Sequence, residues 1–554
     1  MIKRILIILL CTLRGALWAQ QEVVYLQTDK GLYLSGETVW FSAWCLDTES
    51  RQASLLSKVL YVELLDAEAQ SVLRQKVWLE DGKAQGQLFI DGELSTGMYY
   101  LKAYTRWMKN YEPAAFYEGA IRVVHPFRSP DNLMAPEGPF KSQLEIEPNL
   151  FFQTDRESYG NREAITLELA PLEESELASL SVSVYKSDSL NPSPVGNLHR
   201  YLRARRTQRE PEAYRYNSEP ISPMIQGQAS RSLDSLFVLF PGRNARIYSV
   251  RLDEEGRFSF PLSPWIGQEN MIFWAMGQPL GTIEMEDPFV EEHEIYHPIE
   301  WDIDSSDLPF LKSLSLNSQI DNAYLSHSLV RGEKPEPKLL TYFYGEPDWD
   351  YRLDDYTRFP VMDEVFLEII RYAHRRNRRK GEYLDVNDYF ANLHSPSSSI
   401  HFGEPALVLV DGIPIPNMDF IWELDPLKVE HIHIVGRKYF VGDHVFPGVV
   451  NFITYKRNYA GQPFPEQVLE KKYQPLESTR QFHSPNHQEP DSIAHRIPDY
   501  RTLLYWDGGL EWQTDQPHQI RFFSGDDIGH YRIEVNGITR NGKTIYGTGS
   551  FTVR

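Results

Sequence analysis

The clearest catalytic pattern in the sequence is His-Glu-Ile-Tyr-His at residues 293–297, which matches the HExxH pattern of zinc proteases. In that pattern a helix presents both imidazoles on one face, with the glutamate beside them as general base. Here Pro298 follows the second histidine directly, and Pro288 lies five residues before the first, so a helix is disfavoured. We therefore expect neither a metal site nor a catalytic residue at this position.

Two further patterns resemble metal ligands. His431 and His433 alternate along an expected strand and share a face, so they could bind a metal together with a third group. Residues 302–307 (Asp-Ile-Asp-Ser-Ser-Asp) begin like a calcium loop, but the sixth position is not Gly and the twelfth is not Glu. We interpret the histidines as solvent-facing and the acidic run as a solvated linker, so the sequence predicts no metal and no cofactor.

Composition favours a mainly β protein without a nucleic-acid partner. Aromatic residues make up 13% of the 554 residues, and they pack well on pleated sheets. The net charge is −21, from 56 basic and 77 acidic residues, which disfavours binding to phosphate backbones. A chain of this length is expected to form three to five domains of about 100–200 residues each.

Residues 1–19 have the pattern of a secretory signal peptide: Lys3 and Arg4, then an apolar run, then small residues before the expected cleavage site. No later stretch reaches the roughly 18 apolar residues of a membrane helix, so no transmembrane segment is expected after signal removal. Cys45 would then be the single cysteine, which excludes an internal disulfide. An exported, acidic chain of this kind indicates a bacterial envelope.

A repeat with a spacing of 126 residues divides the N-terminal part of the chain. Gln-Thr-Asp-Lys at 27–30 recurs as Gln-Thr-Asp-Arg at 153–156, and Tyr33 and Glu37 recur as Tyr159 and Glu163. Each copy follows a strand-like run and precedes a second one, which predicts two β-sandwiches of one type. The shared polar residues are expected to fix a turn at a corner of each sandwich.

Residues 25–41 resemble the opening of a macroglobulin MG2 domain, and the resemblance continues through residues 82–90 and 95–110. It implies a macroglobulin-like β-sandwich at 20–126 and a second, weaker copy at 142–217. The reactive thioester of that family needs a Cys-Gly-Glu-Gln stretch, which this sequence lacks. Protease trapping through a thioester is thereby excluded, whereas endopeptidase inhibition by contact alone stays open.

Residues 341–458 resemble the plug domain of TonB-dependent receptors in their order of strand, Asp-Gly turn, helix, strand, loop and Gly-led strand. Asp411 and Gly412 form the expected turn, and Tyr439, Phe440 and Gly442 lie where such plugs carry a Tyr-Gly element. These five residues are the partner-binding candidates. The 100 residues after Thr454 are too few for the 22-strand barrel of a receptor, so transport is not implied.

The remaining segments complete the expected organisation. A carboxypeptidase-regulatory-like β-sandwich is expected at 218–290, linkers at 291–340 and 459–495, and a C-terminal β domain at 496–554. A helix is expected at 360–373, followed by a basic cluster around Arg376; a second basic cluster surrounds Arg205. The fold class is thus mainly β: a multi-domain string of macroglobulin/Ig-like β-sandwiches with an α+β plug-like domain.

Two functions fit these features. The leading hypothesis is a non-enzymatic envelope scaffold whose plug-like domain docks on a protein partner at the outer membrane, such as a barrel or assembly machinery. The alternative is a macroglobulin-like endopeptidase inhibitor without a thioester. Periplasmic and surface locations are both compatible with the sequence.

Overall fold

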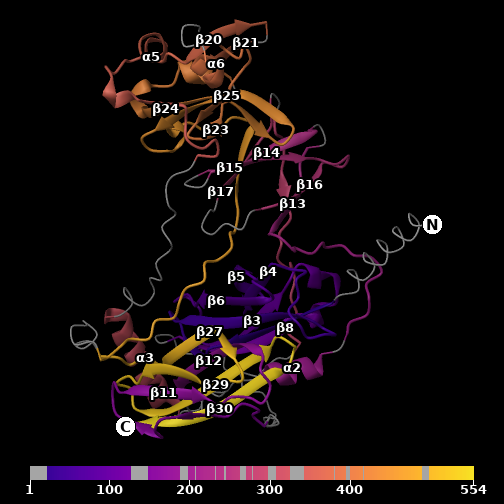
Figure 1. The fold of residues 1–554 in the computed structure, drawn as a ribbon, viewed down its shortest axis with the longest axis vertical. Coiled ribbons are helices and arrows are strands. Elements are labelled where there is room, and N and C mark those ends of the chain that lie inside the picture. The colour runs from indigo at the N-terminus through magenta and orange to yellow at the C-terminus, as the bar shows by residue number, and fades with distance from the viewer. Residues whose placement is uncertain are drawn as a thin grey trace. The chain divides into compact units, whose positions relative to one another are not determined.

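The computed structural model describes residues 21–125, 147–187, 197–205, 207–230, 233–241, 245–262, 270–276, 279–296, 307–324, 342–379, 381–394, 400–415, 417–488 and 498–554. The expected signal peptide and most of the acidic run at 302–307 lie outside these residues. The chain forms two compact units (Figure 1). Unit 1 comprises the described residues of Met1–Pro223, Asp287–Lys334 and Leu476–Arg554, and unit 2 those of Met224–Glu286 and Pro335–Pro475. Both are mainly β, as predicted.

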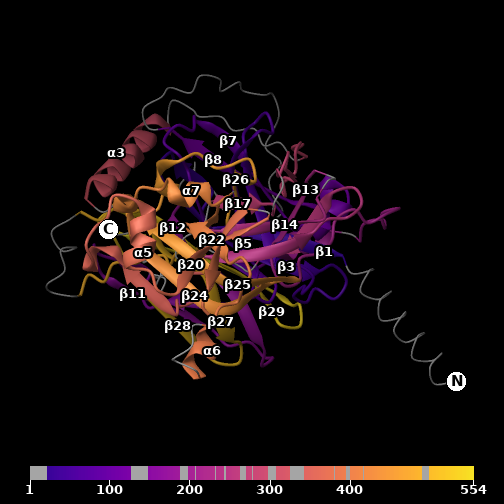
Figure 2. The same ribbon diagram turned by 90° about the horizontal axis from the view of Figure 1, so that it is seen from above.

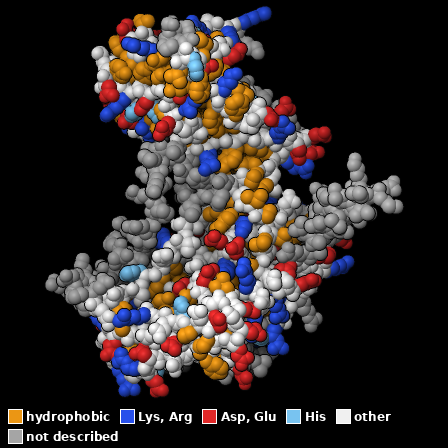
Figure 3. All heavy atoms as spheres, in the orientation of Figure 1, with side chains coloured by type: hydrophobic (Ala, Val, Ile, Leu, Met, Phe, Trp, Pro, Cys, Tyr) orange, Lys and Arg blue, Asp and Glu red, His pale blue; other side chains and the backbone are white. Residues whose placement is uncertain are grey.

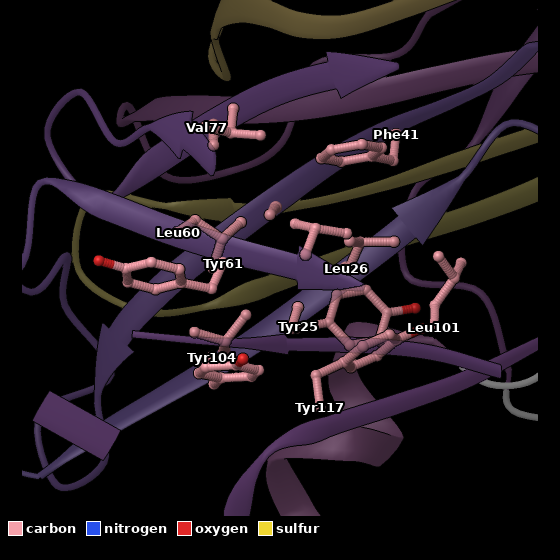
Figure 4. Packing of buried hydrophobic residues seen from close by; sticks show 14 of the residues in the cluster. Tyr25, Leu26, Phe41, Leu60, Tyr61, Val77, Leu101, Tyr104 and Tyr117 are labelled. Atoms are coloured by element: carbon pink, nitrogen blue, oxygen red, sulfur yellow. The ribbon is translucent and has the colours of Figure 1, made fainter. Parts of the chain in front are cut away.

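Unit 1 begins with a β-sandwich over the range of the MG2 resemblance. One sheet has the order β1-β3-β6 and the other β2-β8-β7-β4-β5. Their bounds are β1 Glu22–Thr28, β2 Leu32–Leu34, β3 Thr38–Asp47, β4 Val59–Leu65, β5 Ser71–Trp78, β6 Lys83–Phe89, β7 Gly97–Tyr104 and β8 Tyr117–Val124, with short 3-10 helices at Trp107–Asn110 and Pro113–Ala115. Aromatic and aliphatic side chains from both sheets fill the space between them (Figure 4).

The core of this first sandwich explains part of the aromatic content. Tyr25 packs edge-on against Tyr117, with ring centroids 5.5 Å apart, and Tyr61 stacks on Tyr104 at 5.8 Å (Figure 4). Helix α2 (Leu198–Ala204) adds two buried leucines to the same core, and Asn197 caps it by accepting a hydrogen bond from the amide of Arg200.

The second sandwich of unit 1 is built from two distant parts of the sequence (Figures 1 and 2). Its sheets have the orders β10-β30-β29-β12-β27 and β28-β11-β9. The bounds are β9 Phe152–Thr154, β10 Ser158–Tyr159, β11 Ala164–Leu169, β12 Leu177–Lys186, β27 Leu503–Gln513, β28 His518–Phe523, β29 Gly529–Thr539 and β30 Thr544–Val553.

The two ranges expected to be separate domains, 142–217 and 496–554, therefore share one core. Strand β12 pairs with β27 on one side and β29 on the other, so a strand of the first range lies between two of the second. The physical reason is burial, because the four strands of the first range are too few to bury their own apolar side chains. The strands of the second range complete both sheets. Buried residues of both ranges, such as Leu167, Val182, Trp512 and Val535, meet in the shared core.

Unit 2 contains a smaller sandwich with sheets β16-β13-β18 and β15-β14-β17-β26. The bounds are β13 Met224–Gln228, β14 Ser235–Phe240, β15 Arg246–Arg251, β16 Arg257–Pro261, β17 Asn270–Trp274, β18 Glu284–Met285 and β26 Val468–Lys472. Strand β26 lies in the range expected to be a linker, 459–495. It pairs with β17 because that edge strand offers free backbone groups, a pairing that composition alone does not reveal.

The rest of unit 2 is an α+β region around the five-stranded sheet β19-β24-β25-β22-β23. The strands of this sheet are β19 Trp349–Arg352, β22 Leu407–Val410, β23 Ile413–Pro414, β24 Val429–Val441 and β25 His444–Thr454, and a separate two-stranded sheet consists of β20 Ala373–Arg378 and β21 Gly381–Val386. The helices of this region are α5 Met362–Glu368, α6 Tyr389–His394 and α7 Asp419–Trp422, with 3-10 turns at Leu353–Asp355, Pro426–Lys428 and Tyr459–Gly461. The expected order of strand, turn, helix and two strands is present from β22 to β25.

Two local predictions differ from the structure. The helix expected at 360–373 ends at Glu368, and Ala373 begins β20, so the basic cluster around Arg376 lies on the β20–β21 hairpin. Cross-strand pairing explains the difference, because Arg375 on β20 forms a 2.8 Å ion pair with Glu382 on β21.

Helix α3 (Leu308–Tyr324) lies in unit 1 within the expected linker 291–340. No helix among the described residues is both long and apolar enough to cross a membrane.

Candidate functional site

The two copies of the repeat form the same hydrogen-bond network. At the N-terminal corner (Asp29, Lys30, Tyr33, Glu37), Asp29 Oδ1 accepts from Tyr33 Oη at 2.6 Å and from the amide of Trp40 at 2.8 Å. The amide of Lys30 donates to Tyr33 Oη at 3.2 Å, and Lys30 Nζ pairs with Glu37 Oε2 at 2.7 Å. These bonds join the turn after β1 to the start of β3.

The second corner (Asp155, Arg156, Tyr159, Glu163) repeats each bond. Asp155 Oδ1 accepts from Tyr159 Oη and from the amide of Thr166, both at 2.8 Å. The amide of Arg156 donates to Tyr159 Oη at 2.9 Å, and Arg156 Nη1 pairs with Glu163 Oε2 at 2.9 Å. The prediction that the repeated residues fix a turn is confirmed by these bonds.

The HExxH stretch is not helical where it is described. Residues 291–296 form no helix or strand, and His297 lies outside the described residues. His293 Nε2 instead contacts Glu63 Oε1 on β4 at 2.9 Å, and Tyr104 Oη donates to the same carboxylate. Burial by itself would raise the pKa of Glu63, but the bonds from His293 and Tyr104 hold this pKa below its usual value. The histidine thus serves to anchor residues 287–296 on the first sandwich.

An apolar cleft with a volume of about 500 Å³ lies within unit 2. Its walls come from β17, β22, β25 and the segments around them, and its lining is mainly hydrophobic: Trp274, Met276, Leu384, Pro405, Ala406, Leu407, Val408, Pro414, Ile415, Met418, Val445, Phe446 and Pro447, with Glu382 and Glu404 among the polar members. On the face drawn in Figure 3, hydrophobic side chains gather over unit 2.

Three exposed hydrophobic side chains mark the rim of the apolar cleft. Met276 and Val445 line it and are 48% and 50% exposed, and Phe440, directly opposite Val445 in the β24–β25 pair, is 65% exposed. Directly opposed residues of an antiparallel pair share a face, so Phe440 extends the apolar surface beside Val445. Exposed apolar surface next to an apolar hollow is typical of protein-binding and ligand-binding sites.

Of the five predicted partner-binding residues, Asp411 and Gly412 form a turn that is hydrogen-bonded to the end of β25. They have φ angles of 52° and 83° and form the predicted turn after β22. The Asp411 carboxylate accepts from the amide and hydroxyl of Thr454, both at 2.7 Å, and from the amide of Tyr459 at 2.9 Å. These bonds tie the turn to the end of β25, so the carboxylate is engaged within unit 2.

The other three predicted residues lie on the β24–β25 hairpin rather than in a loop. Tyr439 Oη donates to the carbonyl of Phe343 at 2.7 Å, and Gly442 has a φ of 57°. A Cβ at Gly442 would lie 2.8 Å from Cβ of Ser249 on β15, so this glycine allows the hairpin tip to pack on the small sandwich. The Phe440 side chain is 65% exposed, and it adjoins the apolar cleft. The sequence did not reveal the cleft because its lining comes from segments up to 173 residues apart, from Trp274 to Pro447; the one local signal was the apolar run at 405–415.

Both basic clusters are partly engaged in internal contacts. Arg378 pairs with Glu404 at 2.9 Å beside the apolar cleft, and this contact lowers the pKa of the Glu404 carboxyl. Arg205 donates to the carbonyls of Ala114 and Phe116 and lies over the ring of Tyr201. Each cluster therefore has a structural role in the described residues.

A comparison with known protein families finds a match over the range of the first sandwich. The family model of the MG2 domain matches residues 23–119. The whole chain is similar to Escherichia coli alpha-2-macroglobulin activated by porcine elastase, with 8% identity and a TM-score of 0.25 over 96% of this chain and 44% of that one.

Two further structures are similar at comparable levels. Salmonella alpha-2-macroglobulin reacted with methylamine has 8% identity and a TM-score of 0.24, over 96% of this chain and 39% of that one. The Escherichia coli adhesin FdeC has 13% identity and a TM-score of 0.15, over 46% of this chain and 60% of that one. The chain spans less than half the length of either macroglobulin. No curated protein matches it.

Proposed function

We propose that this chain is a non-enzymatic, exported binding protein of the cell envelope that uses the apolar cleft of unit 2 to hold an apolar segment of a protein partner. The observation that carries the proposal is the cleft itself: about 500 Å³ lined by hydrophobic side chains, with Met276, Val445 and Phe440 exposed at its rim. Burying such side chains against a partner contributes roughly 25 cal/mol for each Å² removed from water. The outer membrane, where the plug-like resemblance points, is the expected location.

A site-specific crosslinker tests the proposal in intact cells. A photoreactive residue in place of Val445 is expected to trap one defined protein, identified by mass spectrometry, and Met276→Lys in the same chain is expected to abolish the adduct. The matched control is the same residue at Leu367 on α5, which is 80% exposed and does not line the cleft.

Binding of the purified partner then gives the quantitative test. Val445→Lys and Met276→Lys are expected to weaken binding at least tenfold, whereas Leu367→Lys leaves it unchanged. Identical adducts from positions 445 and 367, or equal affinity of the cleft variants and the wild type, would reject the cleft as the binding site.

The second candidate function is inhibition of endopeptidases by contact, and the MG2 match at residues 23–119 favours it. In this case the purified chain is expected to slow the cleavage of large protein substrates by trypsin or elastase more than that of small peptides. Full protease activity at a tenfold molar excess of the chain removes this candidate. The cleft variants distinguish the two functions, because they would leave inhibition through unit 1 intact.

A further inference from the structure

Asp350, His431 and His433 come together on two neighbouring strands of unit 2. Strand β19 pairs with β24, which sets Asp350 opposite His433 and Arg352 opposite His431. His431 Nδ1 lies 2.8 Å from Asp350 Oδ1, and His433 Nε2 lies 3.4 Å from the same oxygen. One donor atom from each of the three side chains lies within 4.8 Å of the other two. The carboxylate that the sequence did not reveal is thus supplied across the sheet.

The spacing of these atoms is close to that of a tetrahedral metal site. Zinc bonds of about 2.0–2.1 Å to nitrogen and oxygen place neighbouring ligand atoms roughly 3.3 Å apart. The distance from His433 Nε2 to Asp350 Oδ1 already has this value, and the distance from His431 requires an opening of about half an ångström. The Asp350 side chain is 46% exposed, which leaves room for water as a fourth ligand.

A second layer of hydrogen bonds orients the buried histidine. His433, whose side chain is only 8% exposed, places Nδ1 3.0 Å from Tyr344 Oη, and Asn451 Nδ2 donates to the same hydroxyl at 2.9 Å. A hydrogen bond at Nδ1 fixes the ring and directs Nε2 toward Asp350, as outer partners of metal-binding histidines do. The ring of Tyr342 packs edge-on against His433, with centroids 4.8 Å apart, and restricts it further.

The charges around the three residues are compatible with a bound cation. Glu430 Oε1 lies 3.9 Å from His431 Nε2 and adds negative charge. The nearby cation Arg457 is paired with Glu430 at 2.9 Å, which reduces its repulsion of a metal ion. Two imidazoles and one carboxylate are a donor set that suits zinc and related divalent transition metals better than calcium or magnesium.

We propose that Asp350, His431 and His433 form a binding site for one divalent transition-metal ion of the zinc class. The ion replaces the contacts that Asp350 Oδ1 makes with both imidazoles and links β19 to β24. Tyr344 and Asn451 act as positioning residues that hold His433. The site is independent of the apolar cleft and of the function proposed for it.

The test uses the full chain, freed of metal by dialysis against a chelator. Zn²⁺ titrated in competition with a chromophoric indicator is expected to bind at one ion per chain. Co²⁺ is expected to give the visible absorption of a low-coordinate nitrogen and oxygen site, which hydrated Co²⁺ lacks. Because the ion binds the folded chain, saturating Zn²⁺ should also raise the midpoint of thermal unfolding.

Two variants at side chains that are not fully buried separate ligation from folding; Asp350 is 46% and His431 23% exposed. Asp350→Asn keeps the hydrogen-bonding shape but removes the anionic donor, and His431→Gln removes one imidazole. Each is expected to weaken Zn²⁺ binding at least tenfold and abolish the Co²⁺ spectrum, with an unchanged circular dichroism spectrum. The control His374→Gln alters a half-buried histidine of β20 that contacts Asn387. Absence of stoichiometric binding, or equal binding by all three variants and the wild type, overturns the proposal.

Discussion

The two corners of unit 1 make the same bonds in opposite environments. At the N-terminal corner Asp29 is fully buried, and burial raises its pKa to about 7 despite the charge of Lys30 and the bond from Tyr33. At the second corner Asp155 is exposed; partial desolvation would raise its pKa, but the bonds from Thr166 and Tyr159 outweigh it and lower this pKa. A side-chain network thus sets the geometry of a turn, whereas its surroundings decide the charge of the carboxyl at neutral pH.

The difference arises because the second sandwich covers the first corner. Ser183 on β12 donates a hydrogen bond to the carbonyl of Asp29, and Lys30 Nζ donates to Thr502 Oγ1 at 3.1 Å. Asp29 Oδ2 is buried and has no hydrogen-bond partner among the residues that the structure describes. A carboxylate in such a place lacks the solvation that ionisation needs. At the second corner the Asp155 side chain is 42% exposed, so it keeps its contact with water.

The largest expected effect is on the pH dependence of stability. The pKa of Asp29 is raised from 3.8 to about 7, so the folded chain holds a proton that the unfolded chain loses between these values. Stability therefore falls as pH rises from 4 to 7, by roughly 4 kcal/mol at most. Asp29→Asn removes this fall, measured as the difference between variant and wild-type urea midpoints across the pH range.

Asp155→Asn provides the contrasting control. The pKa of Asp155 is lowered, so its contribution is present above the ordinary value of 3.8 and is lost as pH falls through the folded value. This variant is expected to alter only the acid limb of the stability profile. Equal slopes between pH 4 and 7 for Asp29→Asn and the wild type would show that burial does not perturb Asp29.

Alanine substitutions of Asp29 and Asp155 are expected to lower the free energy of unfolding by different amounts at constant pH. At pH 5, Asp29→Ala leaves the buried amide of Trp40 without its side-chain acceptor and is expected to cost about 3 kcal/mol. Asp155→Ala exposes the equivalent groups to water and is expected to cost about 1 kcal/mol. Urea unfolding of both variants gives the comparison, and equal losses would contradict it.

The tyrosines give a smaller contrast. Tyr33→Phe removes a hydroxyl that donates to Asp29 and accepts from the amide of Lys30, at an expected cost of about 2 kcal/mol. Tyr159→Phe removes the equivalent hydroxyl at the exposed corner and is expected to cost less than about 1 kcal/mol. Thermal unfolding monitored by near-ultraviolet circular dichroism measures both, and a larger loss in Tyr159→Phe would refute the ordering.

The smallest expected effect concerns the contact between β12 of the second sandwich and the N-terminal corner. Ser183→Ala removes one hydrogen bond to the carbonyl of Asp29 and is expected to cost about 1 kcal/mol. Ser181→Ala, on the same strand, serves as the control because its hydroxyl bonds to the carbonyl of Asn536 instead. Urea unfolding of both variants measures the cost, and an unchanged midpoint in Ser183→Ala would contradict the prediction.

Local features of the fold were predictable because they depend on residues close in the chain. The repeated Asp, Tyr and Glu form turn networks within 11 residues, and Asp411-Gly412 adopts the positive φ angles typical of its hairpin turn. Strand pairing over long separations was not predictable. The partners of β12 lie more than 300 residues away, and β26 is a short strand inside a stretch rich in Pro, Gln and His.

The candidate sites divide in the same way. Phe440 was identified from the sequence, but the apolar cleft beside it depends on the packing of β17, β22 and β25. His431 and His433 were recognised as a pair on one strand face, but Asp350 lies 81 residues before His431 in the sequence. Its place beside the histidines follows from the register of β19 against β24.

The mainly β class, the MG2 resemblance and the turns at both corners follow from the sequence alone, because turn chemistry and strand alternation act between near neighbours. Which corner is buried, which ranges share a core and which carboxylate lies beside the histidines follow from the tertiary fold. Burial and strand register depend on surfaces that fold together from distant parts of the chain, and these set the charge of Asp29 and the position of Asp350.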